Sequence, residues 1–164
     1  MEREWEQEPD HIEFDHRGLH CEITRHEEMK HLCGYVYIPI FQGHMTQRLM
    51  AYLIDHPLDN GFDYMVFEEY FDIYVHGGVM YGDIVEKETG AFIKIGFDCA
   101  HSGDLIPGMK ATLEQVSRAA GRTPSMWGDL GLFRDIYRNM AYVKKEIENM
   151  VDAIIGGEDL HVNK

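Results

Sequence analysis

A stripe of apolar residues near the carboxyl end of the chain restricts the fold more than any other feature. Apolar side chains recur there at intervals of three and four residues, and Gly156-Gly157 follows the last of them. The members of the stripe are Ile136, Met140, Val143, Ile147, Met150, Val151 and Ile154. These intervals place the side chains on one face of an α-helix, and a continuous apolar face must be covered. We therefore expect a long amphipathic helix that packs either on a sheet of the same chain or on a partner helix.

A second pattern, with a period of two, indicates a strand in Ala91–Cys99. Successive side chains of a strand point to opposite faces, so every second residue shares a face. The apolar face is made of Ile93, Ile95, Phe97 and Cys99. Phe71–His76 alternates in the same way, and Val79–Tyr81 continues the pattern after two glycines. We predict that the two segments form an antiparallel hairpin closed by a turn at Glu86–Gly90.

The amino-terminal part also favours strands. Ile12–Ile23 is typical of a strand pair or of one bent strand, with Arg17-Gly18 as the turn signal. Cys33–Ile38 is typical of a strand that Pro39 ends. Two shorter helices are predicted for Thr46–Asp55 and Met109–Ala120. The first would present Leu49, Met50, Leu53 and Ile54 on one face.

Strands therefore cluster before residue 100 and helices mostly after it, which favours the α+β class over alternating βαβ units. We expect an antiparallel sheet, built from the amino-terminal and central segments, that packs against carboxyl-terminal helices. In this scheme residues 1–10 are a flexible acidic leader, residues 11–157 form a single domain and residues 158–164 are a frayed tail.

The charge of the chain excludes several classes of partner. Fifteen Lys and Arg against 29 Asp and Glu give a formal net charge of −14. Most of the surface would repel a phosphate backbone or an anionic membrane, although a local positive pocket could still hold a small anion. No apolar run reaches the roughly 18 residues of a membrane span. We expect a cytoplasmic protein that binds a small molecule and neither a nucleic-acid polymer nor a membrane.

The cysteine content agrees with a reducing compartment. The three cysteines, Cys21, Cys33 and Cys99, are an odd number and contain no CxxC pair. Free thiols are therefore the simpler expectation.

Two glycine-flanked segments, 75–81 and 96–104, carry the residues best suited to chemistry. In the predicted hairpin His76 lies roughly opposite Phe97 or Asp98. Asp98, His101 and Asp104 recur every third residue, so a turn could aim all three inward toward His76. The candidate catalytic residues are His76, Asp98, His101 and Asp104.

These four residues allow two kinds of chemistry. Two imidazoles and two carboxylates suit a divalent metal ion such as zinc, magnesium or manganese. Without a metal, a His–Asp pair can act as a general base and its orienting group. The candidate substrate-binding residues nearby are Gly77, Gly78, Tyr81, Cys99 and Ser102.

Each of these residues also has a structural interpretation. Asp98 and Asp104 could cap turns, and the glycine pair could form a bulge. Cys99 shares a face with Ile95 and Phe97, which favours a buried, inert thiol over a nucleophile. Ser102 is not part of a GxSxG elbow, and the chain has no GxGxxG or P-loop motif.

Five histidines before residue 32 show no standard metal-binding spacing, and we interpret them mainly as solvated strand or loop residues. They are His11, His16, His20, His26 and His31.

Several blocks of the chain resemble a family of small phage and prophage proteins. The blocks lie within residues 18–150 and appear in the family's order. They are Gly18–Ile23, His31–Val36, His56-Pro57, Val75–Gly78 with Tyr81, Gly96–Asp104, and a helix that spans Tyr137 to Glu146. The GFDCAHSGD block, Gly96–Asp104, is the most specific. The chain differs from the family in its Gln42–Asp55 insert and at Val79-Met80, where the family has a hydrophobic residue and Thr.

The family carries no settled activity, so the resemblance implies a phage setting and no mechanism. The leading hypothesis is a hydrolase that acts on a small polar or nucleotide-like substrate. The alternatives are a module that binds and sequesters such a ligand in host–phage conflict, and a structural or partner-binding protein. A homodimer formed through the apolar stripe remains open beside burial of the stripe on the protein's own sheet.

Overall fold

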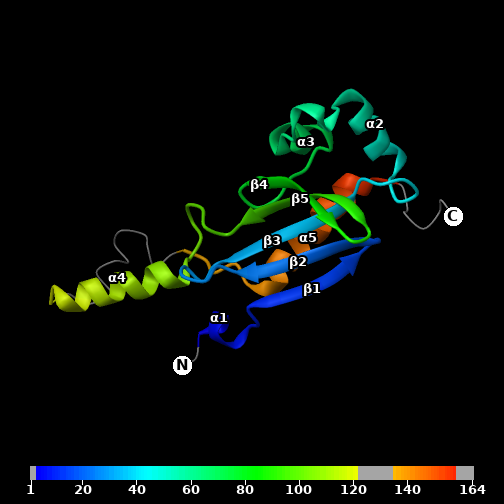
Figure 1. The fold of residues 1–164 in the computed structure, drawn as a ribbon. Helices are drawn as coiled ribbons and strands as arrows, with labels where there is room; N and C mark the ends of the chain where they lie inside the picture. The colour runs from blue at the N-terminus through cyan, green and yellow to red at the C-terminus, as the bar shows by residue number, and fades with distance from the viewer. Residues whose placement is uncertain (1–2, 122–134, 158–164) are drawn as a thin grey trace.

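The fold is a five-stranded antiparallel sheet with its longest helix packed on one face (Figure 1). The computed structural model describes residues 3–121 and 135–157. The strands lie side by side in the order β1-β2-β3-β5-β4. They are β1 (His11–His16), β2 (Leu19–Arg25), β3 (Leu32–Pro39), β4 (Tyr81–Lys87) and β5 (Gly90–Asp98). The helices are α1 (Glu4–Gln7), α2 (Gln47–Asp55), the 3-10 turn η1 (Leu58–Asn60), α3 (Tyr64–Tyr70), α4 (Pro107–Ala119) and α5 (Met140–Ile155). The predicted α+β class is confirmed.

Strands β1, β2 and β3 form a meander in sequence order. Arg17 and Gly18 both have positive φ, 49° and 87°, and they make the tight β1–β2 turn where it was predicted. Gly18 adopts this backbone conformation without steric cost. Pro39 is the last residue of β3, as predicted.

The β4–β5 hairpin is present, but its first strand begins later than predicted. Tyr81 pairs with Gly96 and Lys87 with Gly90, so the turn lies where the sequence indicated. The Phe71–His76 segment is irregular, and the prediction of a strand there is wrong. Its alternation reflects burial, because Phe71 and Ile73 point into the core while their neighbours are exposed. His76 therefore lies outside the ladder and is not opposite Phe97 or Asp98.

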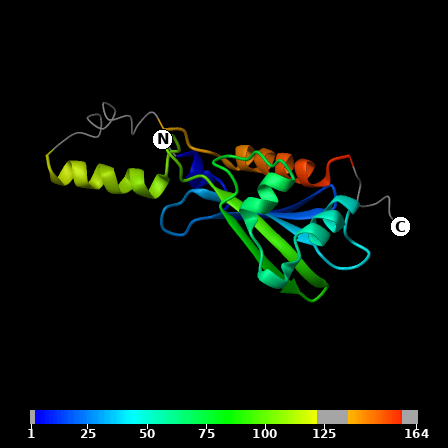
Figure 2. The same ribbon diagram turned by 90° about the horizontal axis from the view of Figure 1, so that it is seen from above.

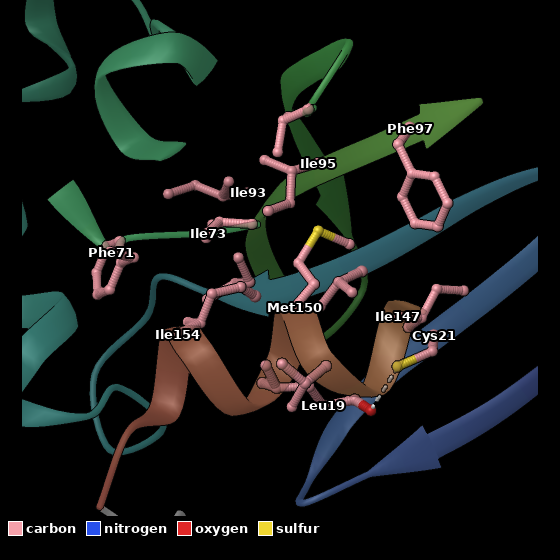
Figure 3. Packing of buried hydrophobic residues seen from close by; sticks show 14 of the residues in the cluster. Leu19, Cys21, Phe71, Ile73, Ile93, Ile95, Phe97, Ile147, Met150 and Ile154 are labelled. Atoms are coloured by element: carbon pink, nitrogen blue, oxygen red, sulfur yellow. Dashed lines mark hydrogen bonds between the residues drawn. The ribbon is translucent and has the colours of Figure 1, made fainter. Parts of the chain in front are cut away.

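The sheet covers the apolar stripe of helix α5. It contacts β2 and β3 on the inner face of the sheet, and Ile147, Met150 and Ile154 point toward strand residues such as Ile95 and Cys21 (Figure 3). Its buried residues are Val143, Ile147, Met150, Val151, Ile154 and Ile155. The stripe begins at Met140. Ile136 precedes the helix and is 57% exposed, which corrects the predicted start.

Helix α2 forms where predicted, but it buries a different face. Leu49 and Tyr52 are buried, whereas Met50 and Ile54 are 41% and 78% exposed. The Tyr52 ring meets Phe67 of α3 edge-on at 5.1 Å, and this aromatic contact rotates the buried face toward α3.

Helix α4 agrees with the predicted helix and extends beyond the end of the sheet in both views (Figures 1 and 2). In the leader, α1 is followed by Glu8, whose carboxylate accepts hydrogen bonds from the Tyr137 hydroxyl and the backbone N–H of Met140. The predicted tail at 158–164 lies outside the described residues.

Candidate functional site

The site lies at the end of the sheet where β5 stops. Nε2 of His76 lies 2.7 Å from Oδ2 of Asp104. An ionised carboxylate can only accept, so Nε2 carries the proton and donates it to Asp104. His76 comes from the loop before β4 and Asp104 from the turn after β5, so two of the four predicted catalytic residues are in direct contact.

Asp104 is the centre of a buried polar network. Its side chain has no exposed surface. Nε of Arg138 donates to Oδ1 at 2.9 Å, and the backbone N–H of His101 donates to Oδ2 at 3.0 Å. Burial alone would raise the pKa of Asp104, but the hydrogen bonds from His76, Arg138 and the His101 backbone outweigh it and lower the pKa. Asp104 therefore stays ionised and orients the His76 ring.

The second nitrogen of His76 meets a tyrosine. Nδ1 lies 2.8 Å from the hydroxyl of Tyr142 on α5. Because Nε2 holds the ring proton, Nδ1 accepts from the phenol, which makes a continuous Asp104–His76–Tyr142 chain. Burial, followed by the charge of Glu146, raises the pKa of Tyr142, so the phenol keeps its proton at neutral pH.

His101 and Asp98 form a second, more exposed pair beside the first. Nε2 of His101 is 3.0 Å from Oδ1 of Asp98, although the two atoms make no hydrogen bond. The rings of His76 and His101 meet edge-on at 5.7 Å. Gly77 has φ +70°, and a Cβ built on it would lie 2.1 Å from Nε2 of His101. This glycine lets the loop pass directly against the His101 ring.

The predicted binding residues divide into near and distant ones. Gly77 borders the site, while Gly78 lies next to the Val79 N–H that donates to Glu68. Tyr81 is the first residue of β4, and its ring contacts Tyr35 edge-on. Ser102 is exposed on the turn. Cys99 is 2% exposed, and burial strongly raises the pKa of its thiol, so it is an inert core residue. All three cysteines are free, as predicted.

The space beside the network is small. Asp104 borders a cavity of about 30 Å³ with Leu105 and Met109, enough for little more than a water molecule. Access comes instead from the surface, where the side chains of Arg138 and His101 are 23% and 27% exposed.

A group of side chains with the spacing of metal ligands lies elsewhere, on β1 and β2. Within residues 3–121 and 135–157, the group whose ligand atoms all lie within 4.8 Å of one another is His11, Glu13 and Glu22, on the exposed side of β1 and β2. His76, Asp98, His101 and Asp104 make no such group of three among those residues. His11 and Glu22 approach only through strand pairing, which sequence spacing alone did not reveal.

Arg138 and Tyr142 were not among the predicted site residues. They lie 34 and 66 positions from their partners Asp104 and His76. The spacing of four positions within the predicted helix would place both residues on one helical face. In the structure, however, Arg138 precedes α5, which begins at Met140, so this spacing is not what brings them together. The guanidinium of Arg138 lies 4.9 Å from the Tyr142 ring centroid.

Comparisons with known proteins add no relative: no family model, curated protein or solved structure matches the chain. Among the described residues, no helix is long and apolar enough to cross a membrane.

Proposed function

We propose that the protein is a hydrolase for a small polar, nucleotide-like substrate, with His76 as its general base. The hydrogen-bonded chain Asp104–His76–Tyr142 supports this proposal. A buried carboxylate that fixes the tautomer and orientation of an imidazole, whose other nitrogen faces a hydroxyl, is an arrangement suited to proton transfer. Buried charged networks of this kind are also concentrated at functional sites.

The chain of hydrogen bonds allows a balanced proton path. A water molecule attacks the ester or anhydride bond and gives a proton to the Tyr142 oxygen, while Tyr142 passes its own proton to Nδ1 of His76. The same path, run backward, delivers a proton to the leaving oxygen. Asp104 stabilises the imidazolium that forms between the two transfers.

Arg138 favours an anionic group on the substrate. Its Nε is bound to Asp104, and no hydrogen bond to its terminal nitrogens is found among the described residues. A planar guanidinium with free donors binds phosphate or carboxylate oxygens well. In a chain of net charge −14, this local cation is a suitable place for a small anion.

A second function, binding without turnover, is favoured by one observation. Both nitrogens of His76 and both oxygens of Asp104 already have partners, so neither residue offers a free atom to a substrate. In that case the network would be a rigid support and Arg138 would hold the ligand. With the phage resemblance, either activity would act on a small molecule in the host cytoplasm.

The test is an incubation of the protein with a panel of nucleoside mono-, di- and triphosphates and cyclic nucleotides, followed by chromatography and phosphate measurement. We expect turnover of at least one compound, and we expect His76→Asn to slow it by about a hundredfold or more. His11→Gln is the matched control, because it removes another histidine bonded to a carboxylate and should leave the rate unchanged.

The outcomes separate the alternatives. Ligand recovered unchanged after denaturation of the complex would support the binding module and contradict hydrolysis. Absence of both binding and turnover, with a lower melting temperature in His76→Asn, would leave the network a purely structural role.

A further inference from the structure

A second hollow, much larger than the cavity beside Asp104, lies far from the His76 network. It has a volume of about 750 Å³, in the range of small-molecule sites, and lies where the β1–β2 and β4–β5 turns approach each other. Phe92 borders this hollow, whereas Asp98 of the same strand belongs to the His76 site. Six residues of strand, at roughly 3.3 Å each, separate them by about 20 Å.

Aromatic rings from three segments form the walls. Tyr37 comes from β3, Phe92 from β5, and Phe41 from the loop after β3. The rings of Phe41 and Phe92 meet edge-on at 5.4 Å. Their planes are 77° apart, so a planar ligand that stacks on the face of one ring meets the other ring edge-on. Stacking on an aromatic face accepts any base.

Phe41 is held in place by Gly90. A Cβ built on Gly90 would lie 2.5 Å from Cδ1 of Phe41, and Gly90 has φ +146°. The ring thus rests directly on the backbone of the β4–β5 turn, at a position that a larger residue would close. This support fixes one wall of the hollow before any ligand binds.

The polar edge of the hollow carries a carboxylate, Asp15. Its Oδ1 lies 3.2 Å from Nδ1 of His20, whose Nε2 is bound in turn to Glu13 at 3.1 Å. The Asp15 side chain is 77% exposed, so its oxygens can reach a ligand in the hollow. A carboxylate accepts two parallel hydrogen bonds from two adjacent N–H donors.

We propose that this hollow binds a guanine-type base, stacked on one of the Phe41 and Phe92 rings and edge-on to the other, with its two adjacent N–H donors on Asp15. Adenine lacks that pair of neighbouring donors, so the site discriminates between the two purines. The ligand is the base or its uncharged nucleoside. This site is separate from the proposed hydrolytic centre, and neither proposal depends on the other.

The experiment is a calorimetric titration of the whole protein with guanosine and, separately, with adenosine. We expect saturable guanosine binding, with adenosine at least about tenfold weaker. Asp15→Asn should weaken guanosine binding by about tenfold or more. Glu13→Gln is the matched control, because Glu13 is on the same strand and bonded to the same histidine but does not border the hollow.

Nuclear magnetic resonance locates the binding. Guanosine should shift the amide signals of Phe41, Thr89 and Phe92, and should not shift those of Asp104 and Arg138. Three results would each overturn the proposal: no saturable binding of guanosine, equal affinity for adenosine, or Asp15→Asn and Glu13→Gln variants that bind alike.

Discussion

Two histidine–carboxylate pairs of nearly equal length lie in very different surroundings. His76 and Asp104 are 2.7 Å apart, and the Asp104 side chain is completely buried. His11 and Glu22 are 2.8 Å apart, and the His11 side chain is 48% exposed. Distance alone therefore does not give the energetic value of such a pair. Burial and the number of additional donors decide it.

The two carboxylates illustrate the difference. Each has a lowered pKa, although burial alone would raise it in both cases. Glu22 receives hydrogen bonds from His11 and Tyr37 at the sheet surface, where water competes for the same oxygens. The Asp104 side chain has no exposed surface, so loss of its charge leaves Arg138 and His76 without their ionised acceptor.

Asp104→Asn should therefore have the largest effect. We expect the free energy of unfolding to fall by about 3 kcal/mol, since breaking a buried ion pair leaves uncompensated charge. This corresponds to a melting temperature lower by roughly 6–12 °C in a chain of this size. Thermal unfolding followed by circular dichroism measures it. Glu22→Gln is the matched control, and an equal loss in both variants would refute the difference between the two pairs.

Gly77→Ala should destabilise the protein by about 2 kcal/mol. The left-handed backbone costs an alanine roughly 1–2 kcal/mol, and the new methyl group also displaces the His101 ring. Urea unfolding of Gly77→Ala with and without His101→Ala separates the two costs. If the clash between the new methyl group and the His101 ring contributes, Gly77→Ala will cost less unfolding free energy in the His101→Ala background. The same cost in both backgrounds would exclude a contribution from this clash.

The contribution of Asp104 should disappear in acid. Its pKa in the folded protein lies below the ordinary value of 3.8, so its stabilisation is complete above that pH and is lost as the pH falls through the lower folded value. The difference in unfolding free energy between wild type and Asp104→Asn should thus be constant from pH 7 to about pH 5. It should shrink below pH 3.8. A difference that persists undiminished at pH 2 would show that packing, and not charge, is responsible.

His11→Gln should have the smallest effect, less than about 1 kcal/mol, because exposed ion pairs contribute little. Urea unfolding in low and high salt measures it, and the small loss should decrease further in salt. A loss comparable with that of Asp104→Asn would mean that the exposed pair is as important as the buried one.

The periodic parts of the fold could be predicted from the sequence. The alternation in β5 and the apolar stripe of α5 both mark residues of the same hydrophobic core. The periods differ because a sheet buries every second residue of a strand, whereas a helix buries every third or fourth. Helix α3 was missed, although Asp63 caps its first turn by accepting from the N–H groups of Met65 and Val66. Without α3, the buried alternation of Phe71 and Ile73 resembled a strand.

The candidate site was predicted only in part. The density of acid and histidine in the Gly96–Asp104 block pointed to Asp104 and His101, and the glycines pointed to His76. The other half of the network comes from Tyr142 on α5 and from Arg138, which lies in the segment before α5. Ile136 of that segment pairs with the backbone of Gly103 and Leu105. Spacing along the chain carries no information about that pairing or about how α5 crosses the sheet, and so neither residue could be assigned a partner.

The position of β3 in the sheet has a consequence for the order of assembly. Its neighbour on one side, β2, is synthesised just before it, but its neighbour on the other, β5, follows only after α2, α3 and β4. Until β5 is made, β3 is an unpaired edge strand of the nascent meander. Its side chains Val36 and Ile38 also stay exposed to solvent until α5, which is synthesised later still, packs on the sheet. Such long-range pairing slows folding, so ribosome-bound intermediates of this chain should depend on chaperones during that interval.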